Sequence, residues 1–433
     1  MSIPNTTPRD LSPDPASKTP RLLLFAATTG YQIRVFADAA RRLGVDLTLA
    51  TDRCHVLEDP WGDHAIPVRF EDIPASLEAL RGHRFDAVAA VGDQPAVLAA
   101  EAAQAFGISF HPPSAVRACH DKYLARQLFQ AAGLPVPQFF RVALREPAAA
   151  AARRAPYPCV LKPLGLSASR GVIRTNDPEE FVTAFNRIKA LLEKSPDIRI
   201  AREERDRYLQ VEAYIPGREF AVEGLVTCGM PRILAIFDKP DPLEGPFFEE
   251  TIYVTPSRET EAVQQGIRDA VEKAVRALGL HHGPFHAELR ANDGGVWMLE
   301  VAARPIGGLC SRALRFGGGM PLEELILRHA TGEDISTLRL ADAASGVMMI
   351  PIPRGGVYEG VTGIEEARTV SGIEDVIVTA KVGQTLVPLP EGATYLGFIF
   401  ARGSEPAAVE QALRIAHARL NFRIATALPT LKP

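Results

Sequence analysis

The segment between residues 21 and 110 alternates short apolar runs with longer stretches whose apolar residues recur at helical spacing. The runs predict strands, and the stretches between them predict amphipathic helices. The predicted strands are 21–25, 45–49, 85–91 and 108–110, and the predicted helices are 31–43 and 96–106. Parallel strands need long crossover connections, which these helices provide. The alternation therefore predicts an α/β fold that begins with an open parallel sheet.

The composition is that of an ordinary globular protein, and it excludes several classes of function. The chain has 433 residues, enough for roughly three domains of common size. Its formal net charge of −4 supplies no basic field, so nucleic acid is not expected as a partner. No apolar run approaches the roughly 18 residues of a membrane span, so no membrane association is expected.

The cysteines and the first residues indicate the compartment. Five cysteines are scattered along the chain without a CxxC pair, which argues against a disulfide framework or a zinc knuckle. Reduced thiols in a cytoplasmic protein are the expectation. Residues 1–20 contain five prolines and no apolar h-region, so they predict a disordered leader and no signal peptide.

Two acidic residues lie on neighbouring strands of a predicted hairpin. Apolar runs flank the turn signal Asn-Asp-Gly-Gly at residues 292–295. Because side chains alternate along strands, Glu288 and Glu300 are expected to project together from one face. Such a carboxylate pair suits Mg²⁺. Arg304 would add a permanently charged side chain that donates hydrogen bonds to phosphate. A solvated hairpin with a surface ion pair is the alternative.

A lysine and a small-residue loop follow one another in the second third of the chain. Lys162 ends a short strand-like run, and residues 165–172 are rich in glycine and serine. Backbone N–H groups and hydroxyls of such a loop, with a nearby ammonium, can surround phosphate oxygens. A flexible hairpin tip is the alternative. Neither GxxxxGK[ST] nor GxSxG is present, so the loop is neither a Walker A loop nor a nucleophile elbow.

The proline-rich stretch 237–250 predicts a loop near the hairpin that selects the substrate. Phe247 or Phe248 would wall an apolar pocket, and Glu249 or Glu250 would hold a substrate ammonium. Solvated acids beside buried rings are the alternative.

Further substrate contacts are predicted on either side of the acidic pair. His286 and Glu288 fall on one strand face, so this histidine is expected to face the substrate. A zinc site formed with the histidines at 281–282 is disfavoured, because no further soft ligands cluster there. Gly307 and Gly308 would present backbone N–H groups to a carboxylate, with a plain turn as the alternative.

Changes of pattern divide the chain into a leader and three domains. Residues 21–118 predict a Rossmann-like domain, and residues 119–329 a β-rich domain that contains the loop and the hairpin. Residues 330–433 mix strands with a final helix, which predicts a third, α+β domain.

The order of these pieces resembles the ATP-grasp superfamily over nearly all of the chain after residue 20. The resemblance is carried by Lys122 before Gly133-Leu134-Pro135-Val136-Pro137, by Val160-Leu161-Lys162-Pro163, by the Ser/Gly loop, by Val211-Glu212-Ala213-Tyr214-Ile215-Pro216-Gly217-Arg218-Glu219, and by Glu288, Glu300 and Arg304. It implies an α/β ATP-grasp architecture, with a Rossmann-like preATP-grasp domain, a central ATP-grasp domain and an α+β C-terminal domain. The central domain would carry a mobile lid subdomain at about 157–215.

The same resemblance implies ATP and Mg²⁺ as cofactors, with Mn²⁺ as a substitute cation. The implied ATP-binding residues are Lys122, Lys162, Ser167, Ser169, Gly171, Glu212, Ala213, Ile215 and Glu219. Among them, Glu212 would lie near the adenine amino group and Glu219 would accept ribose hydroxyls. Glu288 and Glu300 would be the metal ligands, and Arg304 the catalytic residue.

One position departs from the family pattern. Many members carry asparagine two residues after the second glutamate, where this chain has Ala302, so a second metal would lose one oxygen ligand. The run Glu300-Val-Ala-Ala-Arg-Pro-Ile-Gly-Gly looks closest to the L-amino-acid ligase branch, which joins a carboxylate to an amine through an acyl phosphate. The implied partners are small-molecule carboxylates and amines, amino acids first among them. Assembly into a homodimer stays open.

Two other functions remain as alternatives. A carboxylase or carbamoyl-phosphate-type enzyme would activate bicarbonate, although no segment for a biotin carrier or a glutaminase is recognised. A catalytically silent ATP-binding regulatory protein would explain Ala302, but Glu288, Glu300 and Arg304 weigh against it.

Overall fold

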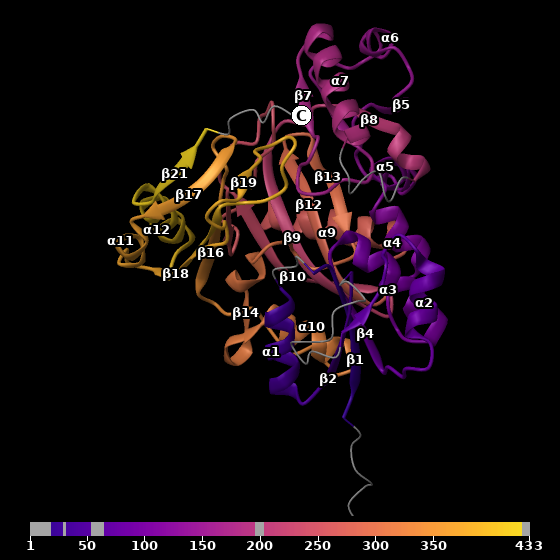
Figure 1. Cartoon of the computed structure of the whole chain (residues 1–433), viewed down its shortest axis with the longest axis vertical. Helices are drawn as coiled ribbons and strands as arrows, with labels where there is room; N and C mark the ends of the chain where they lie inside the picture. Colours follow the sequence, from indigo (N-terminus) through magenta and orange to yellow (C-terminus); the bar gives the residue numbers. More distant parts are fainter. Residues whose placement is uncertain (1–18, 29–31, 53–64, 195–202, 427–433) are drawn as a thin grey trace, which may run out of the picture.

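A computed structural model of the chain describes residues 19–28, 32–52, 65–194 and 203–426. The predicted leader lies outside these residues except for its last two positions. The described strands form an N-terminal sheet, a small sheet and a central sheet, with two minor sheets beside them. In Figure 1 the small sheet lies at the top, the N-terminal sheet at the bottom, and the central sheet between them.

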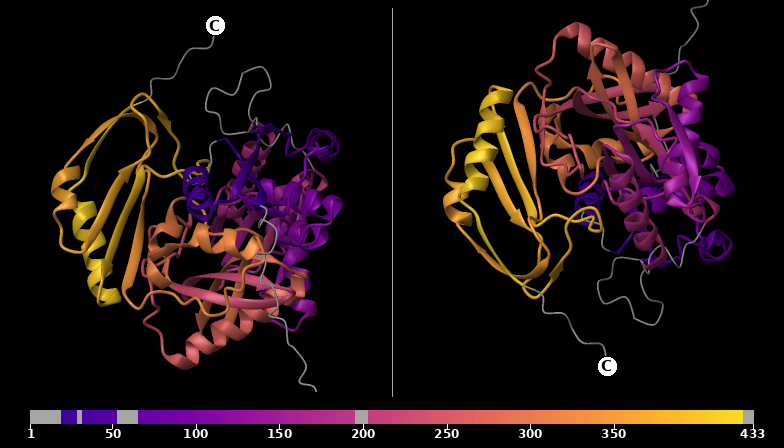
Figure 2. Two further views of the ribbon diagram at one scale, coloured as in Figure 1. Left: turned by 90° about the horizontal axis from the view of Figure 1, so that it is seen from below. Right: turned by 90° about the horizontal axis from the view of Figure 1, so that it is seen from above.

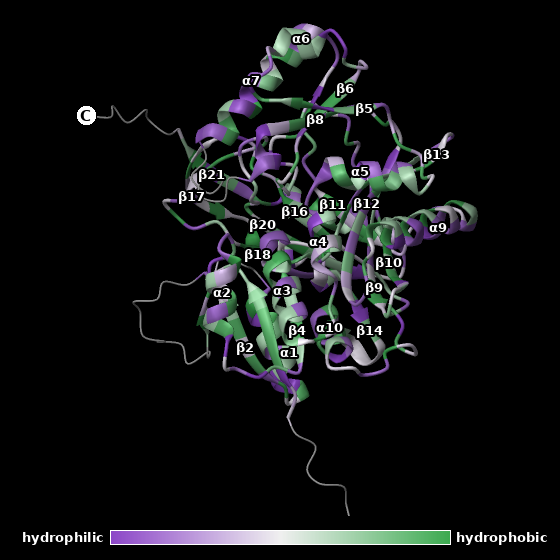
Figure 3. Ribbon diagram, turned by 90° about the vertical axis from the view of Figure 1, so that its right-hand side faces the viewer, coloured by the Kyte–Doolittle hydropathy of each residue, from purple (hydrophilic) through white to green (hydrophobic). Residues whose placement is uncertain are grey.

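The N-terminal sheet is parallel and has the order β3-β2-β1-β4. Its elements are β1 (Arg21–Ala26), α1 (Ile33–Leu43), β2 (Asp46–Thr51), β3 (Ile66–Pro67), α2 (Ile73–Leu80), β4 (Ala87–Val91), α3 (Asp93–Phe106) and α4 (Pro113–Cys119). The strands are mostly green in Figure 3, as expected for a parallel sheet covered on both faces. The α/β prediction is confirmed here.

One predicted strand of this region is wrong. Residues 108–110 form no strand, because the Ile108 amide bonds back to the Ala103 carbonyl at the end of α3. Phe110 is buried and packs against the ring of His111, with centroids 5.2 Å apart. A short apolar run after a helix was thus a core contact and not a sheet strand.

The small sheet is antiparallel, with the order β5-β8-β6-β7. After α5 (Lys122–Ala131), its elements are β5 (Phe139–Ala143), α6 (Ala148–Ala152), β6 (Cys159–Pro163), β7 (Ile173–Thr175), α7 (Pro178–Lys194), the 3-10 turn η1 (Glu204–Arg207) and β8 (Tyr208–Ala213). Phe181 and Phe185 of α7 pack on Leu161 in a core of their own. This unit begins at Phe139, before the expected lid boundary at 157.

The central sheet has the order β13-β12-β9-β10-β11-β16-β20-β18. The elements of this region up to residue 330 are β9 (Arg218–Thr227), β10 (Met230–Lys239), β11 (Ile252–Thr255), α9 (Glu261–Leu278), β12 (Gly283–Asn292), β13 (Gly295–Ala302), η2 (Cys310–Ala313), β14 (Arg315–Phe316), η3 (Gly317–Gly319), β15 (Met320–Pro321) and α10 (Leu322–Ala330). The strands β14 and β15 form a separate two-stranded sheet. The predicted hairpin is confirmed as β12 and β13, with Asn292 opposite Gly295. The loop predicted for 237–250 is too long, because residues 237–239 complete β10.

Three of the C-terminal strands continue the central sheet, and three others form a three-stranded sheet of their own. The C-terminal elements are β16 (Ala344–Ile350), β17 (Gly356–Thr362), α11 (Ile364–Arg368), β18 (Ile373–Val378), β19 (Thr385–Leu386), β20 (Gly397–Gly403), α12 (Pro406–Ala418) and β21 (Asn421–Ala425). The three-stranded sheet has the order β19-β17-β21. Pairing of β11 with β16 joins the two regions, so backbone hydrogen bonds cross the predicted boundary near residue 330. Figure 2 shows the C-terminal strands and α12 as a layer beside the rest of the chain.

Strand alternation gives the central sheet one apolar and one charged face. Phe220 and Val222 of β9 lie beside Phe285 and Leu289 of β12 in a buried apolar core. The helix α9 covers this core; it starts after the capping hydroxyl of Thr260 and ends at a left-handed glycine. No described helix, α9 included, combines the length and the apolar character needed to cross a membrane.

Gly224 tests the packing of this apolar face. It lies opposite Phe285, and an added Cβ would come within 2.1 Å of that ring and 2.7 Å of the Arg232 carbonyl oxygen. We expect Gly224→Ala to destabilise the fold by about 1–3 kcal/mol through overpacking. Gly266→Ala in α9 is the control, since its Cβ would meet Val296 at an ordinary 3.7 Å. This variant is expected to stabilise the fold by about 0.5–1 kcal/mol, because alanine is a better helix former than glycine. Equal midpoints of chemical unfolding for the two variants would contradict the close packing of Phe285 on Gly224.

Candidate active site

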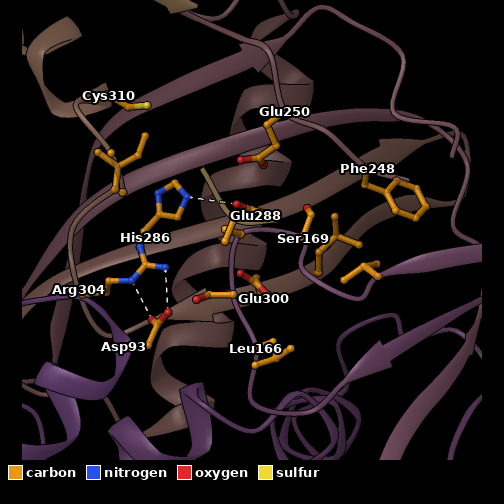
Figure 4. A pocket seen from close by; sticks show the side chains of 18 of the residues that line it. Asp93, Leu166, Ser169, Phe248, Glu250, His286, Glu288, Glu300, Arg304 and Cys310 are labelled. Atoms are coloured by element: carbon orange, nitrogen blue, oxygen red, sulfur yellow. Dashed lines mark hydrogen bonds and ion pairs between the residues drawn. The ribbon is translucent and has the colours of Figure 1, made fainter. Parts of the chain in front are cut away.

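A cavity of about 370 Å³ lies where the small sheet, the charged face of the central sheet and the N-terminal domain meet. Lys122, Lys162 and Ser167–Ser169 line one part, and Asp93, Arg304 and Gly307–Gly308 line another. Glu288 and Glu300 lie between them. Figure 4 shows these carboxylates pointing into the same space as Glu250. The cavity therefore brings together most of the residues that the sequence singled out.

Glu212 is the buried anchor of the small-sheet side. Its carboxylate is ion-paired with Lys162 and with Arg126, whose Nη2 lies 2.8 Å from Oε2, and it accepts a hydrogen bond from Gln210 at 2.7 Å. Burial disfavours the charged carboxylate, but Arg126 and Lys162 lower the pKa of Glu212 to about 2. The charge of Glu212 thus fixes the Lys162 ammonium at the cavity wall.

The Ser/Gly loop is tied to the first lysine. Lys122 Nζ donates to the Leu166 carbonyl at 2.6 Å and lies 3.2 Å from Glu300 Oε2. Beyond it, Ala168 and Ser169 both have φ of +55°, a conformation that turns successive amides toward one side. The arrangement places an ammonium, two hydroxyls and backbone N–H groups around one part of the cavity.

Lys239 joins three carboxylates on the charged face. Its side chain is 2% exposed, and its Nζ lies 2.9 Å from Glu219 and 3.6 Å from Glu288 and donates a hydrogen bond to Glu250. Burial and the neighbouring Glu288 raise the pKa of Glu250 to about 7. Burial also opposes ionisation of Glu288, but Lys239 and His286 lower its pKa below the usual range. One of the two acids therefore carries its charge firmly, and the other titrates near neutrality.

These carboxylates are suitable ligands for a divalent cation. Among the described residues, Glu219, Glu250 and Glu288 offer ligand oxygens within 4.8 Å of one another. Glu300 is outside that group but lies directly opposite Glu288 in the β12–β13 register. Hard oxygen donors fit Mg²⁺ or Mn²⁺, and a cation would offset the repulsion that raises the pKa of Glu250.

His286 connects the acids to the loop that carries the glycine pair. Its Nδ1 lies 3.2 Å from Glu223 and its Nε2 3.4 Å from Glu288. Burial disfavours the imidazolium, but the hydrogen bonds to both carboxylates raise the pKa of His286 to about 9. Glu223 also accepts the Ile306 amide, and Gln32 donates to the Ile306 carbonyl at 2.8 Å. The backbone before Gly307 is therefore held from two domains.

Arg304 is oriented by an aspartate that the sequence analysis did not single out. Its Nε and Nη2 donate to the two oxygens of Asp93 at 2.8 and 3.3 Å, as the dashed lines in Figure 4 mark. Burial opposes both charges, yet the pair raises the pKa of Arg304 and lowers that of Asp93. A fixed guanidinium with remaining N–H donors at a cavity wall is suited to bind an anion.

Not every predicted site residue lines the cavity. Lys122, Lys162, Ser167, Ser169, Glu212, Ile215, Glu219, His286, Glu288, Glu300, Arg304, Gly307 and Gly308 do. Gly171 does not, since its amide bonds to Pro390, and Ala213 pairs within the small sheet. Glu249 is also outside the lining, where Glu250 and Phe248 stand instead. The strand β11 begins two residues after Glu250, and that register decides which acid faces inward.

Of three further residues in or beside the cavity, two had a signal in the sequence and one had none. Asp93 directly follows Gly92 at the carboxyl end of β4, where open α/β sheets bind ligands. Arg126 falls on the apolar stripe of α5 between Ala125 and Phe129, an unusual place for a charge. Lys239 was hidden, because its position opposite Glu219 became evident only with the β9–β10 register.

Comparison with family models agrees with the predicted resemblance. Residues 155–313 match the ATP-grasp domain, and residues 348–425 match L-amino acid ligase C-terminal domain 2. The chain therefore contains an ATP-grasp domain and, after it, a C-terminal domain of the kind found in L-amino acid ligases.

Relatives and solved structures agree with this assignment. The chain is 24% identical to an uncharacterized protein of Sinorhizobium fredii, over 89% of this chain and 79% of that protein. It is 29% identical to an alanine--anticapsin ligase of Bacillus subtilis, over 53% of this chain and only 50% of that protein. The structure is similar to an L-amino acid ligase of Bacillus licheniformis, with a TM-score of 0.77, 25% identity and coverage of 95% and 100% of the two chains.

The buried pair of Arg126 and Glu212 gives a test of stability. Arg126 is 1% exposed and also donates to the Met298 carbonyl, so Arg126→Met leaves a buried carboxylate with only Lys162 as a cation. We expect a loss of about 3–5 kcal/mol in the free energy of unfolding. Arg141→Met is the control, since exposed Arg141 lies over the rings of Tyr208 and Tyr123, at 4.4 and 5.6 Å, and forms no ion pair among the described residues. Equal unfolding midpoints for the two variants would contradict the buried-pair assignment.

The raised pKa of His286 gives a test by titration. Its stabilising contribution is full below pH 6.5, the ordinary pKa, and is lost as the pH rises through about 9. NMR titration of the metal-free protein, assigned with His286→Gln, is expected to show this pKa. A divalent cation at Glu288 competes with the imidazolium, so adding Mg²⁺ should lower it. A midpoint near 6.5 without metal would contradict the two ion pairs.

Proposed function

We propose that this ADP-forming ligase activates a substrate carboxylate with ATP and joins it to an amine, with an L-amino acid as at least one of the two. The observation that carries the proposal is that one cavity has two lysines and a hydroxyl-rich loop in one part and the Arg304–Asp93 pair in another. Two relatives carry the names of amino-acid ligases, the alanine--anticapsin ligase of Bacillus subtilis and a D-alanine--D-alanine ligase of Pseudomonas entomophila, which favours the same class of substrate here.

ATP would lie against the small sheet. Lys122 and Lys162 supply positive charge for its phosphates, and Ser167 and Ser169 supply hydroxyl donors above them. The small sheet would act as the lid, since it has its own core and its described strands pair only with one another. The carboxylates Glu288 and Glu300 would hold Mg²⁺, which neutralises phosphate charge when bound.

Arg304 would stabilise negative charge at the reacting carboxyl group. Transfer of the γ-phosphoryl group to a carboxylate gives an acyl phosphate, and attack by an amine gives a tetrahedral oxyanion before phosphate leaves. Arg304 can donate to both species without reorganising, because Asp93 holds its guanidinium by two hydrogen bonds. The backbone N–H groups of Gly307 and Gly308 would bind the substrate carboxylate.

The substrate ammonium would be held by Glu250 rather than by Glu249. Glu250 lines the cavity beside Glu288 and Tyr253, and it titrates near neutrality in the absence of a ligand. An arriving ammonium would favour its charged form, in the same way that Lys239 favours that of Glu288. His286, between Glu223 and Glu288, would hold the acids in place on this side.

The first test is release of ADP and phosphate from Mg-ATP with pools of the twenty L-amino acids, beside bicarbonate as a separate co-substrate. We expect release that depends on amino acids and falls at least about 100-fold in Glu300→Gln, because the variant loses a charged ligand of the Mg²⁺ that would neutralise the transferred phosphate. Asp293→Asn, in the exposed turn of the same hairpin, is the matched control and should be unchanged.

The other outcomes discriminate among the alternatives. Stimulation by bicarbonate alone would replace the ligase with a carboxylase-type reaction. Binding of Mg-ATP without release of ADP under any condition would favour a silent nucleotide-binding protein, for which Ala302 is the observation in the sequence. Amino-acid-dependent release that survives Glu300→Gln would retain the ligase and reject Glu300 as a metal ligand.

A further inference from the structure

The small sheet is bonded to a loop from the far end of the chain. The Gly171 amide donates to the Pro390 carbonyl at 2.8 Å, and Arg170 Nε donates to the Glu391 carbonyl at 3.0 Å. Gly171 and Arg170 end the Ser/Gly loop, whereas Pro390 and Glu391 belong to the segment between β19 and β20. The C-terminal domain thus touches the loop that would cover the phosphates.

Arg187 of α7 joins three separate segments. Its Nε and Nη2 donate to the two oxygens of Glu391 at 2.6 and 2.9 Å, a bidentate pair. Its guanidinium also lies 5.0 Å from the centroid of the Phe247 ring, within the range of a cation–π contact. One side chain of the small sheet therefore holds both the 387–395 segment and the 240–251 segment.

Both segments held by Arg187 also line the cavity. Phe248 and Glu250 follow Phe247 directly, and Ala393 and Tyr395 lie just after Glu391. Phe248 stacks on Tyr214 of the small-sheet connection, with centroids 6.5 Å apart. A ligand that orders these inward side chains will also order Phe247 and Glu391 on the outer side of the same segments.

A second contact fixes the 240–251 segment in the same way. Arg174 of β7 donates from Nη1 to the Glu244 carbonyl at 2.7 Å and from its amide to the Pro246 carbonyl at 2.9 Å. Its guanidinium lies 4.1 Å from the centroid of the Tyr214 ring. The small sheet therefore contacts the 240–251 segment through Arg174 and Arg187, and the 387–395 segment through Arg187, and both segments also line the cavity.

We propose that Arg187 is a positioning residue that couples occupation of the amino-acid end of the cavity to closure of the small sheet over ATP. The inference rests on the proposed function, because it needs an amino-acid substrate beside Glu250 and Tyr395. With the substrate bound, Glu391 and Phe247 stand ready to receive Arg187, and the Ser/Gly loop stays over the phosphates. Without it, the segments give Arg187 a less ordered partner, and ATP is held less firmly.

An ordinary surface ion pair is the competing explanation, and exposure alone does not separate the two. The side chains of Arg187 and Glu391 are 43% and 36% exposed, so the pair adds little to overall stability. Arg154 and Glu146 form a similar pair, 49% and 25% exposed, but both belong to the small-sheet unit and neither reaches the cavity segments. That pair is therefore a matched control.

The experiment measures the KM for ATP at low and at saturating amino acid, using ADP release by the full-length protein. In the wild type, saturating amino acid is expected to lower the KM for ATP. In Arg187→Leu this dependence should disappear, with a KM at saturating amino acid about threefold to tenfold higher and a smaller change in kcat. The double variant Arg187→Glu with Glu391→Arg should restore much of the coupling, and Arg154→Leu should behave as the wild type.

Hydrogen exchange provides a readout that does not depend on turnover. Peptides covering residues 164–175 should gain protection with Mg-ATP plus amino acid in the wild type but less in Arg187→Leu. Retained coupling in Arg187→Leu, the same loss in Arg154→Leu, or no recovery in the charge swap would each overturn the proposal. If no amino acid supports ADP release by the wild type, the proposed function fails. In that case, equal protection by Mg-ATP in the wild type and in Arg187→Leu would show that the Arg187–Glu391 contact does not hold the small sheet closed, and would reject the proposal separately.

Discussion

The register of β9 against β12 is the constraint on which the rest of the structure depends. It sets Glu219 beside Arg290, Ala221 beside Glu288, and Glu223 beside His286, all on one face. The intervening residues, such as Phe220 and Phe285, face the opposite core, so a slip by one position would bury the charges there and expose the rings. The packing of the apolar core therefore determines the register of β9 and β12, and this register brings the charged side chains together on the other face.

The buried charged side chains on this face are stable only because each of them is paired with a side chain of opposite charge. Arg290 and Lys239 share Glu219, while Lys239 and His286 both approach Glu288. Breaking such a set leaves a desolvated charge, which costs more than the intact set contributes. Binding of a cation or an ammonium replaces one partner with another, so a ligand can enter without leaving a carboxylate alone. Such a network is stable without a ligand, and its carboxylates can pair with a bound cation in place of a lysine or a histidine.

The sequence predicted the features that local patterns encode. The Asn-Asp-Gly-Gly turn located the hairpin with Glu288 and Glu300, and alternation correctly placed His286 beside Glu288. What it did not predict depends on contacts between distant segments: Asp93 meets Arg304 across 211 positions, and Arg126 meets Glu212 across 86. The choice of Glu250 over Glu249, and the extension of the central sheet through β11 and β16, follow from backbone pairing that composition does not reveal.

The continuous central sheet has a mechanical consequence. Hydrogen-bonded strands run without a break from β13, which carries Glu300, to β18 near the C-terminal end, so these parts share one stiff frame. The segment with Glu391 runs from β19 of the three-stranded sheet into β20 of that frame, whereas the described strands of the small sheet pair only with one another. A displacement of the small sheet would therefore leave intact the hydrogen bonds between the strands that carry Glu288, Glu300 and the C-terminal strands.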